Sequence, residues 1–116
     1  MNQIDARELM RDVIPKLRAT RHLIETILNE RIKMCHDEDE RQRLTVLQDE
    51  FTLEMTMIRM NLEHLLKRYS DQLEASSRGE RHFQSPILTM DDAEAMAIDR
   101  AKRLYARAYQ LQTGWI

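Results

Sequence analysis

Apolar residues recur at alternating steps of three and four positions from about Ile4 to Cys35, with Thr20 and Arg31 filling two slots of the stripe. This spacing follows the period of an α-helix and predicts one over residues 4–35. Pro15 has no amide hydrogen and clashes with the preceding turn, so we expect a kink there, or a short first helix with Pro15 opening the next. The stripe consists of Met10, Val13, Leu17, Ile24, Ile27 and Met34.

A second helical stretch is predicted over residues 39–74. It carries two apolar stripes on opposite sides of the same helix, and a helix that is apolar on two opposed faces is buried on both. The main stripe comprises Leu44, Leu47, Phe51, Met55, Ile58, Leu62, Leu65, Tyr69 and Leu73. The second stripe comprises Val46, Leu53, Met57, Met60 and His64.

The acidic run at residues 36–40 separates these two stretches. Acidic side chains favour the positive end of the helix dipole, so the run predicts a tight turn followed by the first turn of the second helix. The alternative is one helix that continues through the run, and no Gly or Pro excludes it.

A loop is predicted over residues 75–88, which contain Gly79 and Pro86. The third helix is then predicted over residues 89–112, with Thr89 as its N-cap and Asp92 as the capping-box partner. Thr113 and Gly114 follow as its C-terminal cap.

These elements predict an all-α protein, in which a long antiparallel helical hairpin and a third C-terminal helix form a helical bundle. Gly and Pro occur only twice each, which leaves little turn chemistry for a sheet of many strands. We interpret residues 1–116 as a single helical domain.

The second stripe can be covered in two ways. The third helix can pack on it through its own small-residue face, which would give a compact monomer. Otherwise another chain covers it, and we favour this association because monomers rarely expose large apolar patches. The stripe from Val46 to His64 is therefore the predicted partner interface, in a homo-oligomer or with another protein. The face of the third helix consists of Ala93, Ala97, Ala101, Leu104, Ala108 and Leu111.

The sequence offers little catalytic or metal-binding chemistry. The histidines are scattered, and the spacings Cys-x-x-Cys, His-x-x-x-His and Glu-x-x-His are absent. Cys35 lies in line with the first apolar stripe, where a small buried side chain is expected. We expect no enzymatic activity, no cofactor and no metal site.

Charge gives one further candidate contact. The formal net charge is −2, which recruits neither nucleic acid nor an anionic membrane. Arg100, Arg103 and Arg107 nevertheless share one face of the third helix and are a possible anion contact. The single cysteine and the absence of a long apolar run lead us to expect a cytoplasmic protein that does not enter the membrane.

Residues 58–68 and 88–92 resemble the helical part of GINS replication subunits, although no stretch resembles the small β-domain that those proteins usually carry. We expect a non-enzymatic adaptor or structural subunit that acts through apolar helix faces. One alternative is a nucleic-acid-associated regulatory or replication-type protein that uses the basic stripe. Another is a small assembly or secretion-type chaperone.

Overall fold

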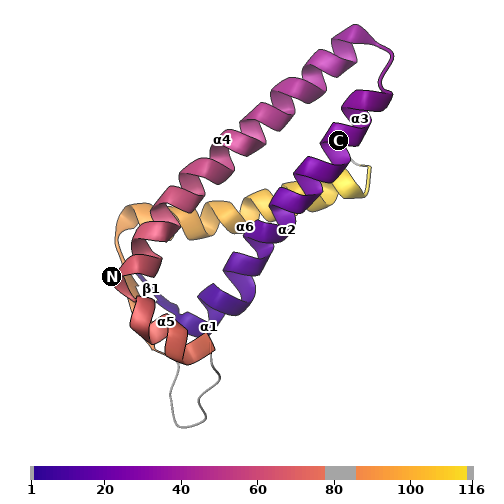
Figure 1. Ribbon diagram of the computed structural model, residues 1–116. Helices are drawn as coiled ribbons and strands as arrows, with labels where there is room; N and C mark the ends of the chain where they lie inside the picture. The colour runs from indigo at the N-terminus through magenta and orange to yellow at the C-terminus, as the bar shows by residue number, and fades with distance from the viewer. Residues whose placement is uncertain (1, 78–85, 115–116) are drawn as a thin grey trace.

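Two long helical limbs run antiparallel and form a hairpin, and a third helix lies against both limbs (Figure 1). This computed structural model describes residues 2–77 and 86–114. The molecule is elongated, with extents of 57 × 27 × 20 Å. Helices dominate the described residues, which otherwise form a small two-stranded sheet, and this confirms the predicted all-α hairpin with a third helix.

The first limb is helical from Ala6 to Met34 and contains two wide π-helical turns. The interruption expected at Pro15 is one of these turns, which comes immediately before the helix that has Pro15 in its first turn. Pro15 cannot donate a backbone hydrogen bond, and a wider turn accommodates that loss while the backbone stays helical. The segments are α1 (Ala6–Glu8), η1 (Leu9–Val13), α2 (Ile14–Leu23), η2 (Ile24–Leu28) and α3 (Asn29–Met34).

A tight turn over residues 35–37 joins the first limb to α4 (Glu38–Arg68). The Asp37 side chain caps α4 by accepting a hydrogen bond of 3.0 Å from the Asp39 amide. Arg41 Nη2 donates to the Cys35 carbonyl at 2.6 Å and closes the turn. Residues 36–40 therefore hold a turn and a helix start, and the continuous helix is excluded.

The first residues differ from the predicted helix, because Asn2–Asp5 form strand β1. This strand pairs antiparallel with β2 (Ile87–Met90), with Ile4 opposite Leu88. The pairing satisfies backbone groups and buries Ile4 and Leu88 in the core. The helix consequently begins at Ala6, and the Asp5 side chain caps it.

The second predicted helix, residues 39–74, is broken at Tyr69. The backbone there has φ −117° and ψ 23°, and a separate helix, α5 (Ser70–Ser77), follows. The Thr89 amide donates to the Tyr69 hydroxyl at 3.3 Å, so the break brings β2 against the end of α4. The predicted loop 75–88 is replaced at its ends by α5 and β2, and residues 78–85 lie outside the described residues.

The third helix, α6, spans Asp92–Gln112, and Asp91 rather than Thr89 is its N-cap. The predicted cap was wrong because Thr89 pairs with Gln3 in the sheet, so the helix begins only after the strand ends. At the other end, Gly114 has a positive φ of 85° and donates to the Leu111 carbonyl at 3.1 Å, which fits the predicted C-terminal cap.

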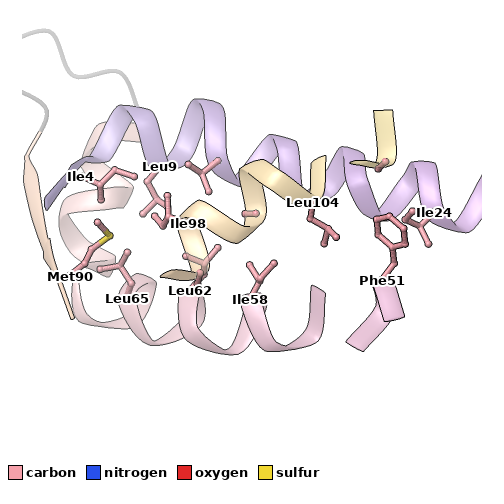
Figure 2. Close-up of a cluster of buried hydrophobic side chains, with 14 of the residues drawn as sticks. Ile4, Leu9, Ile24, Phe51, Ile58, Leu62, Leu65, Met90, Ile98 and Leu104 are labelled. Carbon is pink, nitrogen blue, oxygen red and sulfur yellow. The ribbon is translucent and has the colours of Figure 1, made fainter. Parts of the chain in front are cut away.

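The core lies where α6 meets the two limbs. Fully buried alanines on α6 let its axis approach both limbs closely, and Arg31 Nη2 ties the end of α6 to the first limb by donating to the Leu111 carbonyl at 2.8 Å. The third helix thus packs inside the hairpin and does not cover the second stripe of α4. Figure 2 shows part of this core, which includes Ile4, Leu9, Ile24, Phe51, Ile58, Leu62, Leu65, Met90, Ile98 and Leu104.

Candidate functional site

The second apolar stripe of α4 lies on the outside of the molecule. Leu53 and Met60 keep 64% and 63% of their surface exposed, and Val46 and Met57 keep 50% and 48%. These side chains lie on the side of α4 opposite the buried core positions, as a rotation of about 100° per residue requires. We call the positions Val46, Leu53, Met57 and Met60 the outer stripe.

The outer stripe adjoins the predicted basic residues of α6. Leu53 and Met57 line a shallow hollow between α4 and α6, which Arg100 and Arg103 line from the other side. Met96, also exposed, lies one helical turn before Arg100. The sequence did not indicate that the predicted partner interface and the predicted basic stripe are neighbours. In the structure, residues of both line the same hollow.

The three arginines do not converge on a common point. Arg103 Nη2 pairs with Asp99 at 3.0 Å, and the Arg107 guanidinium lies over the Phe51 ring, 4.9 Å from its centroid. Arg100 makes no hydrogen bond or ion pair with the described residues. The anion contact stays a prediction.

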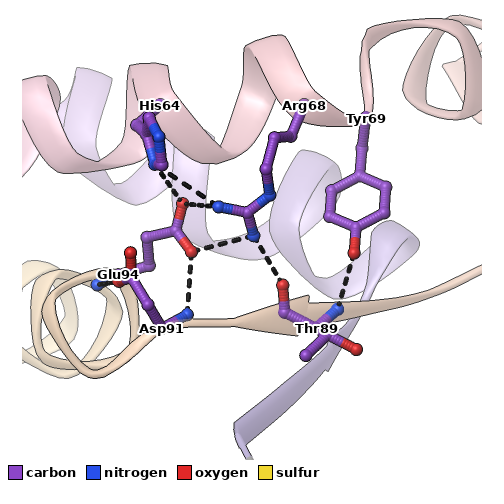
Figure 3. A network of polar contacts seen from close by, with 6 residues as sticks. All are labelled: His64, Arg68, Tyr69, Thr89, Asp91 and Glu94. Atoms are coloured by element: carbon purple, nitrogen blue, oxygen red, sulfur yellow. Dashed lines mark hydrogen bonds and ion pairs between the residues drawn. The ribbon is translucent and has the colours of Figure 1, made fainter.

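His64, the last residue of the predicted interface, belongs to a polar network at the junction of α4, β2 and α6 (Figure 3). Its Nδ1 lies 3.0 Å from Glu94 Oε2, and Arg68 contacts both Glu94 oxygens, with Nη1 and Nη2 at 2.8 and 3.0 Å. Arg68 Nη2 also donates to the Thr89 carbonyl at 2.7 Å. The network therefore fastens the end of α4 to the start of α6.

Glu94 is the charged residue that our sequence reasoning missed. It is only 1% exposed, and the Asp91 amide donates to its Oε1 at 2.9 Å while the Glu94 amide donates to Asp91 Oδ1 at 2.7 Å. This reciprocal arrangement is a capping box, and the spacing Asp-x-x-Glu was the signal that could have located it.

The protonation of Glu94 reflects this environment. Burial, the largest single influence, acts to raise the pKa of Glu94, but hydrogen bonds from the Asp91 amide, Arg68 and His64 outweigh it and hold the pKa below its usual value. The same contact raises the pKa of Arg68, chiefly through its hydrogen bonds to Glu94. The carboxylate is thus kept ionised and paired.

The network also contains the ligand types of a metal site. Ligand atoms of His64, Asp91 and Glu94 lie within 4.8 Å of one another. Arg68 already contacts both Glu94 oxygens, so a cation would have to displace a charged hydrogen-bonding partner. The arrangement is that of an ion pair that joins two helices.

A second hollow lies between the first limb and α4. It has a volume of about 490 Å³, and Leu17, Ile24, Met55 and Leu62 are among the apolar residues that line it. Ion pairs between residues one turn apart lie at its margins, Arg21 with Glu25 at 3.0 Å and Arg59 with Glu63 at 3.7 Å. We call this hollow the hairpin groove.

Comparison with protein-family models, curated proteins and solved structures finds no match for this chain. Among the described helices, none is both long enough and apolar enough to cross a membrane.

Proposed function

We propose that this chain is a non-enzymatic interaction or assembly protein that binds a protein partner through apolar helix faces. The observation that carries the proposal is the outer stripe of α4. It extends from Val46 to Met60, which is about 21 Å along the helix axis at 1.5 Å per residue. Its apolar side chains keep between 48% and 64% of their surface exposed, and none of the described helices covers them.

Burying such a stripe against a partner is favourable. Each square ångström of apolar surface removed from water contributes about 25 cal/mol. Flexible methionines such as Met57 and Met60 also adapt to irregular partner surfaces. The core residues Phe51 and Ile58 face the other way, so a partner can bind without unfolding the hairpin.

The charges around the stripe favour a protein partner over nucleic acid. Glu50 and Glu54 line the same hollow as Arg100 and Arg103, so the hollow carries both signs. A phosphate backbone would meet two carboxylates there, whereas nucleic-acid sites are typically basic throughout.

The alternative of a chaperone has one supporting feature, the hairpin groove, whose apolar lining suits a bound peptide segment.

The double change Leu53→Glu, Met57→Glu tests the proposal. Proteins that co-purify with the chain from its native host should be lost, because two charges would have to be desolvated in the interface. Ala106→Glu, Gln110→Glu adds the same charge at exposed positions of α6 outside the hollow and is the control, which should keep the partners. Circular dichroism should show that both variants fold. Retention of every partner by the folded double variant would refute a role for the outer stripe.

A further inference from the structure

The outer sides of α4 and α6 meet along a line that we call the seam, and the two sides of the seam carry opposite charge. The α4 side contributes carboxylates and the α6 side contributes guanidinium groups to the same hollow. Its lining consists of Glu50, Leu53, Glu54, Met57, Arg100 and Arg103.

Among the described residues, these charges are largely unpaired. Glu50, Glu54 and Arg100 make no hydrogen bond or ion pair with the described residues, and Arg103 pairs with Asp99 on its own helix. The acidic α4 side and the basic α6 side of the seam therefore lie next to each other without direct ion pairs between them. A partner that fits this surface needs the two signs in the reverse order.

We propose that the occupant of this surface is a second copy of the chain, related by a two-fold axis that runs parallel to the seam. Rotation about such an axis places the α4 side of one copy opposite the α6 side of the other. Glu50 and Glu54 of each copy then face Arg100 and Arg103 of its partner, and both edges are matched by one operation. A two-fold axis across the seam would instead place like charges against each other, which is unfavourable.

The apolar residues fit the same arrangement. Met57 and Met60 are exposed on α4 and Met96 is exposed on α6, so both helices offer flexible apolar side chains to the second copy. A stable interface buries roughly 800 Å² on each partner, which is about half of a face of 57 × 27 Å. The molecule is large enough to supply that contact.

This inference rests on the proposed function and names the partner, and complementary charge reversal of the full chain tests it. One variant carries Glu50→Arg and Glu54→Arg, and the other carries Arg100→Glu and Arg103→Glu. Light scattering and native mass spectrometry should find wild type as a dimer. Each variant alone should dimerise at least about tenfold more weakly, because like charges then face each other.

An equimolar mixture of the two variants is the decisive sample. It should form a heterodimer. The arginines on the α4 side of the first variant then face the glutamates on the α6 side of the second, and the unchanged residues of the two variants also carry opposite charge. A general structural defect would not be repaired by mixing. Circular dichroism checks each fold, and the single changes Glu54→Lys and Arg100→Glu replace any double variant that fails to fold.

Two results would overturn the inference. Wild type that stays monomeric at high concentration would exclude the second copy, and a mixture that stays monomeric would exclude the two-fold arrangement. The proposed function fails separately, because it requires the Leu53→Glu, Met57→Glu variant to lose its protein partners whether or not those partners are copies of this chain.

Discussion

The inner and outer faces of α4 have similar apolar character and opposite surroundings. Phe51 and Ile58 on the inner face are each 1% exposed, while Leu53 and Met60 on the outer face keep 64% and 63% of their surface in solvent. Helical periodicity describes both stripes equally well. It reports which residues share a face and does not report what covers that face.

The difference arises from where α6 packs. Ala97, Ala101 and Ala108 are at most 2% exposed, and their small side chains let α6 enter the space between the limbs. In that position α6 contacts both limbs at once, so its apolar face is covered by two elements rather than by α4 alone. The outer stripe of α4 therefore stays exposed among the described residues.

Placing a charge on each face of α4 in turn should give the largest difference in the free energy of unfolding. Ile58→Asp should lower the free energy of unfolding by about 4 kcal/mol, because an unpaired charge cannot be buried in the core. Leu53→Asp, the matched change on the outer face, should alter it by no more than about 0.5 kcal/mol. Urea denaturation of dilute protein measures both. Equal losses would show that the two faces are equally buried.

The contrast extends to buried and exposed carboxylates. Glu94→Gln should lower the free energy of unfolding by about 2 kcal/mol, because a buried, charge-assisted network loses its ionised partner. Glu63→Gln removes an exposed carboxylate that pairs with Arg59 at 3.7 Å and should cost no more than about 0.5 kcal/mol. Thermal unfolding of both variants compares them, and a neutral Glu94→Gln would mean that the network does not join α4 to α6.

The pH dependence of stability should give the smallest effect. The pKa of Glu94 is lowered in the folded state, so its stabilising contribution is fully present above the unfolded value of about 4.3. That contribution should be lost as the pH falls through the lower folded pKa. The stability difference between wild type and Glu94→Gln should therefore shrink in this acidic range. A constant difference would contradict the ionised pairing of Glu94 with Arg68 and His64.

Local sequence signals predicted the helical stretches, the turn after Cys35 and the cap at Gly114, because each depends on neighbouring residues. The break at Tyr69 escaped prediction, since its hydroxyl contacts Thr89 only in the folded chain. The network around Glu94 was missed for the same reason, because Arg68 reaches it from another helix. The outer stripe and the arginines of α6 were each identified from the sequence, but not that Arg100 and Arg103 lie beside Leu53 and Met57.

The sequence by itself determined the all-α class and the two apolar faces of α4 and favoured the hairpin, because backbone geometry and the spacing of apolar residues are local properties. Only the tertiary structure decided that β1 pairs with β2, that α6 enters the hairpin, and that Glu50 and Arg100 meet across one hollow. Those outcomes join residues far apart in the chain, and they follow from which packing removes the most apolar surface from water while its buried polar groups stay paired.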